Sequence, residues 1–291
     1  MNERKCVVIT DLDNTLFDWF EAWYQSFNAM LLCLVEKSEL PRETLVQEIK
    51  TIHQIHGTSE YAFVIESIPS IQARFPNEDL VQRFDECIHA HSKMRKKHLH
   101  LYPGVRDTLR WLKGRNCQIV AYTESMAFYT NRRVRELELD GLLDVLYSPA
   151  DHDLPENLKP DEVRRYPKET YQLKDTKHRY TPKGELKPHP KLLLDIVTGV
   201  GAKPEECVYV GDSLMKDVAM AQHAGIADVH AKYGVAHKQE EYELLRAVTH
   251  WTEEMVERER MIDREEITPT HILENSFSEL STMFEFGSAG S

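Results

Sequence analysis

The stretch VVITDLDNTL, from Val7 to Leu16, is an apolar run that ends in two acidic residues and a threonine. Its apolar residues are continuous instead of alternating with polar ones, which is typical of a strand covered on both faces in a parallel sheet. Ligands of such sheets bind beyond the carboxyl ends of the strands, where loop side chains face one crevice. The pattern therefore predicts a buried strand that delivers Asp11 and Asp13 to a functional edge.

Later segments of the chain read as similar strands, and helical patterns lie between them. The helical patterns at 103–116 and 190–201 each place apolar residues on one face of a helix. Strands that alternate with helices of this length predict βαβ units with right-handed crossovers. The expected fold class is therefore α/β, with a parallel sheet. The further strands are expected at 118–123, 144–148, 207–212 and from Asp228 onward.

The connection between the first two strands is much longer than a crossover needs. Most of it is predicted to be helical, with an aromatic-rich helix at 17–37 and another helix that begins after Pro41. We therefore expect a small helical domain inserted directly after the two acidic residues. The domain prediction is a core formed by 1–16 and 100–291, with a charged insertion at 150–186, and a helical cap domain formed by 17–99.

The insertion at 150–186 is rich in charged residues and proline. Two interpretations stay open, namely a solvated surface segment and a flap over the site. Alternating residues at 169–173 and 178–182 favour a hairpin within it. Beyond about Glu240 the tail is predicted to contain two amphipathic helices, at 240–260 and 274–286, and a flexible end.

Composition limits the partners of the protein. Acids outnumber bases 48 to 36 in 291 residues, and a net charge of −12 suits a small anionic substrate better than nucleic acid. The chain shows neither a signal peptide nor an apolar stretch long enough for a membrane helix. An odd number of cysteines without a CxxC spacing predicts reduced, buried thiols. We expect a cytoplasmic monomer or homodimer with no nucleic-acid or membrane partner. The cysteines are Cys6, Cys33, Cys87, Cys117 and Cys207.

Polar residues gather at the predicted edge of the sheet. Thr123 stands at the end of the second strand, Asp212 stands at the end of the strand at 207–212, and Asp217 lies shortly beyond it. Lys187 stands just before a predicted helix. Taken one at a time, such residues are ordinary in turns and caps. Their occurrence together, each at a strand end or helix start, favours a catalytic site.

Carboxylates brought to one edge repel each other, and a hard divalent cation removes that repulsion. Mg²⁺ prefers oxygen ligands and binds one or two protein carboxylates together with water and substrate oxygens. We expect Asp11 and Asp212 to supply side-chain ligands and Asp13 to supply its backbone carbonyl. Asp217 is expected to support this metal site. The sequence predicts Mg²⁺ as the cofactor.

The remaining groups suit phosphoryl transfer. An ionised Asp11 is placed to attack phosphorus as a nucleophile. Asp13 is placed to act as general acid and base on the leaving oxygen and then on water. Thr123 and Lys187 are a hydroxyl donor and a positive charge for the phosphoryl oxygens.

These segments resemble the motifs of the haloacid dehalogenase superfamily of hydrolases. The first motif is DLDNT at 11–15, followed by YTES at 122–125, LKPHP at 186–190 and GDSLMKD at 211–217. The similarity covers about 1–16 and 100–235. It implies a Rossmann-like core, a magnesium-dependent phosphoaspartyl mechanism and a helical cap that closes over the substrate.

Two details refine this resemblance. The dehalogenase branch lacks the second acid of the first motif, so Asp13 indicates the phosphatase-like branch. Glu124 follows Thr123, where family members often carry a small or amide residue. The main hypothesis is a phosphatase acting on a small phosphorylated metabolite. A phosphomutase of the same superfamily and a non-catalytic interaction protein are the alternatives.

Overall fold

The computed structural model describes residues 4–151, 168–235, 241–252 and 267–288. The chain forms two compact units. The first, here called the core unit, comprises residues 1–18, 100–235 and 265–291. The second, here called the helical unit, comprises residues 19–99 and 236–264.

The core unit is built on a parallel sheet. Among the described residues, seven strands lie in the order β5, β4, β3, β2, β6, β7 and β8, and every neighbouring pair is parallel. The predicted α/β fold class and Rossmann-like sheet are thus confirmed. The strands are β2 (Val7–Thr10), β3 (Gln118–Tyr122), β4 (Val145–Ser148), β5 (Lys177–Tyr180), β6 (Cys207–Gly211), β7 (Ala227–Ala231) and β8 (His271–Leu273).

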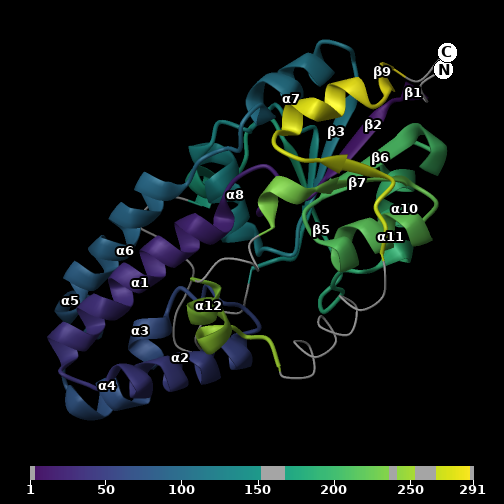
Figure 1. Cartoon of the computed structure of the whole chain (residues 1–291). Coiled ribbons are helices and arrows are strands. Elements are labelled where there is room, and N and C mark those ends of the chain that lie inside the picture. The colour runs from purple at the N-terminus through teal and green to yellow at the C-terminus, as the bar shows by residue number, and fades with distance from the viewer. Residues whose placement is uncertain (1–3, 152–167, 236–240, 253–266, 289–291) are drawn as a thin grey trace. The chain divides into compact units, whose positions relative to one another are not determined.

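Helices cover both faces of this sheet, with α7 on one side and α10 and α11 on the other (Figure 1). All four residues of β2 are buried, and Val7 and Ile9 belong to a cluster that includes Leu193 and Ile196 of α10. Cover on both faces explains why the strands read as continuous apolar runs. The helices of this unit are α7 (Val105–Lys113), α8 (Ala127–Glu136), α10 (Pro190–Gly199) and α11 (Ala219–His223).

The order of the strands places a switch point beside β2. From β2 the chain builds β3, β4 and β5 outward in one direction, and it then returns to form β6 on the other side of β2. The register pairs Val7 with Gln118 on one side and with Cys207 on the other. Loops that leave adjacent strands in opposite directions open a crevice at their carboxyl ends. The loops after β2 and β6 therefore flank the expected ligand site.

Shorter elements complete the core unit. Strand β1 pairs with β9 in a separate two-stranded sheet. The segment after β6, η3, is a single wide helical turn that carries Asp217. These elements are β1 (Arg4–Lys5), β9 (Glu285–Phe286), η1 (Lys168–Tyr171), η2 (Pro204–Glu206), η3 (Leu214–Val218), η4 (Lys232–Gly234) and η5 (Phe277–Thr282).

The helical unit has its own apolar core. Helix α1 packs along α6, and its buried residues recur on one face. Leu31, Leu34, Leu45 and Ile49 are fully buried together, which joins α1 to α2. The helices are α1 (Trp19–Ser38), α2 (Arg42–His56), α3 (Val64–Ser67), α4 (Pro69–Arg74), α5 (Leu80–Arg83), α6 (Asp85–His98) and α12 (Tyr242–Val248).

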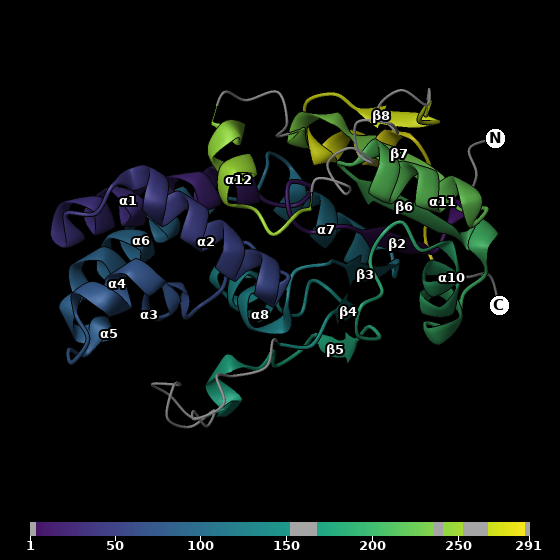
Figure 2. The same ribbon diagram turned by 90° about the horizontal axis from the view of Figure 1, so that it is seen from below.

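The tail departs from the domain prediction, which placed all of 100–291 in the core. Helix α12 lies beside α2 (Figures 1 and 2), and Leu245 and Val248 are buried in the helical unit. His53 Nδ1 lies 2.6 Å from the carbonyl oxygen of Val248, and burial lowers the pKa of His53 to about 4. The neutral ring donates this bond. Helix α12 is too short to be stable alone, and it buries its apolar face against α2.

Two other predicted segments differ from the structure. The hairpin expected at 169–182 is absent from the described residues, where 177–180 instead forms β5, paired in parallel with β4 at the sheet edge. Part of the charged insertion thus extends the sheet. The helix expected at 274–286 is reduced to η5 followed by β9, and the segment 253–260 of the other expected tail helix lies outside the described residues.

The cysteines also differ from the prediction of five reduced thiols. All five lie in the described residues, and Cys33 of α1 forms a disulfide with Cys87 of α6. Cys6, Cys117 and Cys207 are free and buried. The disulfide arises because α1 and α6 pack side by side, a pairing that spacing along the sequence does not reveal. No helix in the described parts of the chain has the length and apolarity to cross a membrane.

We expect thiol titration of the unfolded protein to count three thiols without reductant and five with it. Because the disulfide closes a long loop, the free energy of unfolding should fall by about 2–4 kcal/mol on reduction. A Cys33→Ser/Cys87→Ser variant serves as the control, because its stability should not respond to reductant. Five thiols without reductant would contradict the disulfide.

Candidate active site

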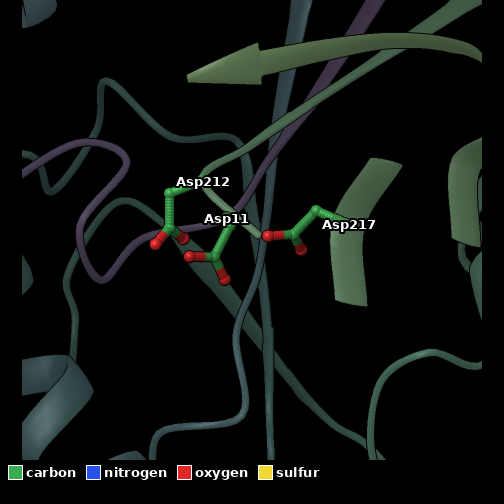
Figure 3. Close-up of side chains that lie close together, drawn as sticks. All are labelled: Asp11, Asp212 and Asp217. Carbon is green, nitrogen blue, oxygen red and sulfur yellow. The ribbon is translucent and has the colours of Figure 1, made fainter. Parts of the chain in front are cut away.

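Three carboxylates meet at the switch point of the sheet. Asp11 directly follows β2, and its N–H donates to the carbonyl of Val210 in β6 at 2.8 Å. Asp212 follows β6, and Asp217 lies on η3. One oxygen from each of the three acids lies within 4.8 Å of the others, and Figure 3 shows the side chains turned toward one another. The structure therefore gathers three of the predicted site residues.

Lys187 reaches the same place from the segment before α10. Its ammonium lies 2.6 Å from Asp11 Oδ1 and 2.9 Å from Asp217 Oδ1, and only 2% of its side chain is exposed. The ammonium also lies 4.9 Å from the ring centre of Tyr122 and 5.5 Å from that of Tyr209. Ion pairs and ring faces together hold one buried positive charge between two acids.

Asp217 is held by three donors. Besides Lys187, the Tyr209 hydroxyl donates to Oδ1 at 2.9 Å and the Ser213 N–H donates to Oδ2 at 3.1 Å. The side chain rests against Gly211, where an added Cβ would lie 2.3 Å from Asp217 Cγ. Glycine is therefore required at this strand end because the carboxylate occupies the space of a side chain. These contacts suit Asp217 to orienting Lys187.

Burial governs the charge state of the acids. It raises the pKa of Asp11 to about 7, although the positive charge of Lys187 opposes the rise. Burial and the neighbouring charges of Asp217 and Asp11 raise the pKa of Asp212 well above its usual range. Burial acts to lower the pKa of Lys187, but Asp11 and Asp217 outweigh it and raise that pKa. The Lys187 ammonium is therefore charged. Its single positive charge does not fully stabilise the ionised forms of Asp11 and Asp212.

The donor set fits a hard divalent cation. When all three carboxylates are ionised, they and the Lys187 ammonium together carry a net charge of −2, which one divalent cation balances. All the acidic groups offer oxygen, the ligand atom that Mg²⁺ prefers. A cation at the cluster would offset the burial and the mutual repulsion that together raise the pKa values of Asp11 and Asp212.

Asp13 lies outside the cluster of three and has its own partners. The Ser125 hydroxyl donates to Asp13 Oδ2, and Arg133 Nη1 lies 3.4 Å from Oδ1. Arg133 comes from α8 and is buried, so it balances the second acid of the first motif. Asp13 still influences the cluster, because its charge contributes to the raised pKa of Asp11.

Thr123 and Glu124 directly follow β3. Thr123 is buried, and its hydroxyl oxygen accepts the Ser125 N–H at 3.1 Å, which leaves the hydroxyl proton available to a ligand. Glu124 turns toward two other loops. Its Oε1 accepts the backbone N–H of Lys187 at 2.9 Å, and its Oε2 accepts the ammonium of Lys216 at 2.8 Å.

The loop that carries the first motif is held by contacts with η4. Asn14 adopts a left-handed φ of 58°, which asparagine tolerates better than most residues. The Tyr233 hydroxyl donates to the carbonyl of Thr15 at 2.7 Å. A Cβ at Gly234 would lie 1.6 Å from the carbonyl oxygen of Asn14, so only glycine permits this approach.

Sequence reasoning missed several of these supports. Tyr209 reads as one more apolar strand residue, Arg133 as an ordinary helix residue and Ser125 as a turn residue. Their roles depend on strands and helices that are distant in the chain, so no local pattern indicates them. Glu124 carried a signal, because an acid stands where the family often has a small or amide residue.

Comparison with known proteins agrees with the motifs. The model of the haloacid dehalogenase-like hydrolase family matches residues 7–225. A phosphoglycolate phosphatase of Nitrosococcus oceani is 26% identical over 235 residues, which cover 79% of this chain and 85% of that protein. A glyceraldehyde 3-phosphate phosphatase of Methanopyrus kandleri is 24% identical over 230 residues, which cover 78% and 84% respectively.

A solved structure shows the same fold. The crystal structure of a 2-haloacid dehalogenase from Pseudomonas syringae pv. tomato is similar with a TM-score of 0.54 at 19% identity. The match covers 97% of this chain and 98% of that one.

We expect Gly211→Ala to lower the free energy of unfolding by about 1–3 kcal/mol, because the new Cβ must displace Asp217. Urea denaturation measures this change. Gly114→Ala is the matched control, since its nearest neighbour, the Arg110 carbonyl oxygen, would lie 3.5 Å from the added Cβ. That control should change stability by less than about 0.5 kcal/mol. Equal stability of the two variants would contradict the close approach.

Proposed function

This chain belongs to the haloacid dehalogenase-like hydrolases and is a phosphatase-like member of them; we propose that it hydrolyses a small phosphorylated metabolite through an aspartyl phosphate, with Mg²⁺ as cofactor. The observation that carries the proposal is the position of Lys187, whose buried ammonium holds Asp11 beside Asp217 and within reach of Asp212. A positive charge at this point favours the ionised Asp11 that nucleophilic attack requires. It also meets the negative charge of a phosphoryl group.

The proposed first step is attack of an Asp11 carboxylate oxygen on phosphorus. A new oxygen–phosphorus bond forms, the bond to the substrate's leaving oxygen breaks, and Asp13 gives that oxygen a proton. In the second step Asp13 takes a proton from water, which attacks the phosphorus of the aspartyl phosphate. Inorganic phosphate leaves, and Asp11 returns to its carboxylate form.

The residues proposed to bind Mg²⁺ are Asp11, Asp212 and the backbone carbonyl of Asp13, with Asp217 in support. When bound, Mg²⁺ neutralises charge on the acids and on the phosphoryl oxygens. Lys187 and Thr123 are proposed to donate hydrogen bonds to those oxygens as charge develops in the transition state.

The surroundings of Asp13 support its proposed part in proton transfer. Ser125 and Arg133 donate to the two oxygens of its carboxylate, which orients the side chain and favours the ionised form that acts as the base in the second step. Orientation of an acid or base toward the reacting oxygen is the first requirement for this kind of catalysis. Asp11 has different partners, which agrees with a division of work between the two acids of the first motif.

The helical unit is proposed to be the cap domain that closes over the substrate and excludes bulk water. Phosphoglycolate and glyceraldehyde 3-phosphate are the first substrates to test, because relatives of this chain are named for them. A panel of phosphorylated metabolites scored by kcat/KM identifies the preferred one. Phosphate release without an acceptor distinguishes a phosphatase from a phosphomutase.

A cytoplasmic location stays part of the proposal, although the Cys33–Cys87 disulfide removes the argument from uniformly reduced thiols. It is supported by the small metabolites for which the relatives are named. The oligomeric state, monomer or homodimer, and the absence of a nucleic-acid partner likewise remain predictions from the sequence.

Asp11→Asn should reduce kcat for a generic aryl phosphate in the presence of Mg²⁺ by about three orders of magnitude or more, because the amide is a poor nucleophile. Phosphate release measures the loss. Asp195→Asn, on the exposed face of α10, is the matched control and should keep full activity. If Asp11→Asn turned over as fast as the unchanged protein, Asp11 would not be the nucleophile.

Mg²⁺ should raise the midpoint of thermal unfolding, because a ligand that binds only the folded state stabilises it. Asp212→Asn should lose most of this rise. Without metal at pH 8, the same variant should unfold at a higher temperature than the unchanged protein, because the raised pKa of Asp212 shows that its ionised form is disfavoured in the folded state. An undiminished response of Asp212→Asn to Mg²⁺ would argue against this ligand set.

A further inference from the structure

One half-buried carboxylate joins three loops of the proposed active site. Glu124 follows Thr123 at the end of β3, and its two oxygens bind separate partners. Oε1 accepts the backbone N–H of Lys187 at 2.9 Å, and Oε2 accepts the Lys216 ammonium at 2.8 Å. Lys216 belongs to η3, the same turn that carries Asp217. The loops after β3 and β6 and the segment before α10 thus converge on Glu124.

These contacts fix the backbone of the lysine that matters most to the site. The side chain of Lys187 has a long, flexible stem, so the place of its ammonium depends on where its backbone is held. Glu124 binds that backbone from one side, while Asp11 and Asp217 bind the ammonium at 2.6 Å and 2.9 Å. The lysine is therefore held at both ends.

A carboxylate suits this task better than the small or amide residue that often follows the threonine. It accepts from two donors at once, and hydrogen bonds to an ionised acceptor are stronger than neutral ones. Burial acts to raise the pKa of Glu124, but the charges of Lys216 and Lys187 outweigh it, and the pKa lies below its usual value. Glu124 is therefore ionised at neutral pH.

We propose that Glu124, neutralised by Lys216, is a positioning residue that acts through Lys187 and sets the ammonium between Asp11 and Asp217. The inference rests on the proposed phosphatase function. It assigns to the second motif a task beyond presenting Thr123, namely holding the lysine of the third motif against η3. Glu124 touches neither the nucleophile nor the metal ligands in any contact described above.

A double-mutant cycle tests this proposal, because two residues that act through one group lose their separate effects when that group is removed. The variants are Glu124→Ala, Lys187→Met and their combination, assayed with an aryl phosphate and Mg²⁺. Glu124→Ala should lower kcat/KM by about 10²-fold, the loss expected when a catalytic group is misplaced by about 1 Å. In the Lys187→Met background the same change should alter kcat/KM by no more than about twofold.

Conservative variants separate the two contacts. Glu124→Gln keeps an acceptor for the Lys187 N–H but loses the charge that pairs with Lys216, so it should retain most of the activity that Glu124→Ala loses. Lys216→Met should resemble Glu124→Gln. Glu136→Ala is the matched control, because its ion pair with Arg132 is of similar exposure in the same unit and touches no site residue; its activity should be unchanged.

The result that would overturn the proposal is additivity, with Glu124→Ala lowering kcat/KM equally in both backgrounds, or full activity of Glu124→Ala. Circular dichroism verifies that each variant folds. If Glu124→Ala does not fold, Glu124→Ser, which is also too short to reach the Lys187 N–H, replaces it in the cycle with Lys187→Met.

Where Lys187→Met is too slow to assay, the affinity for orthovanadate, measured by calorimetry, supplies the same cycle. A chain that hydrolyses phosphate esters but shows additive effects contradicts only this inference. A chain that neither hydrolyses them nor binds orthovanadate contradicts the proposed function as well.

Discussion

The contact of the Lys187 ammonium with Asp11 and Asp217 is the interaction on which the edge of the core unit depends. The three carboxylates lie close enough to repel one another, and burial together with this repulsion raises the pKa values of Asp11 and Asp212. A buried ammonium with good geometry offsets part of that repulsion, whereas removing one partner of such a group leaves an uncompensated charge. Because the charge of Lys187 alone cannot balance three ionised acids, the site keeps an excess of negative charge and suits a divalent cation. Stability and proposed catalysis therefore make opposite demands on the same four side chains.

The supports around this contact come from the two strands on either side of β2. Tyr209 from β6 donates to Asp217, Glu124 after β3 holds the backbone of Lys187, and Gly211 leaves room for the Asp217 side chain. Each support fixes an atom that would otherwise be free to move, which is what a preorganised site requires. The second acid, Asp13, is held separately by Ser125 and Arg133. Two carboxylates only two residues apart thus have different environments, and different environments allow different tasks.

The helical unit shows how a chain can return to a domain it has left. The chain passes from the core unit to the helical unit after Asp18, comes back at His100, and contributes α12 to the helical unit once more before β8. The apolar face of α12 and the carbonyl of Val248 bind α2. The disulfide between Cys33 and Cys87 joins α1 to α6 within the same unit. A unit of this size has a limited core, so extra cross-links and an added helix contribute usefully to its stability.

The sequence by itself determined the α/β fold, the positions of five strands and the set of acids and the lysine at their ends, because strand periodicity and turn chemistry are local properties. It also identified the family, because the four motifs are short and ordered along the chain. Only the tertiary structure decided that α12 belongs with α2, that 177–180 extends the sheet, and that Cys33 meets Cys87. Only it showed that Tyr209, Arg133 and Glu124 contact Asp217, Asp13 and Lys187. Those outcomes depend on which distant surfaces bury one another, and burial between distant segments leaves no period in the sequence.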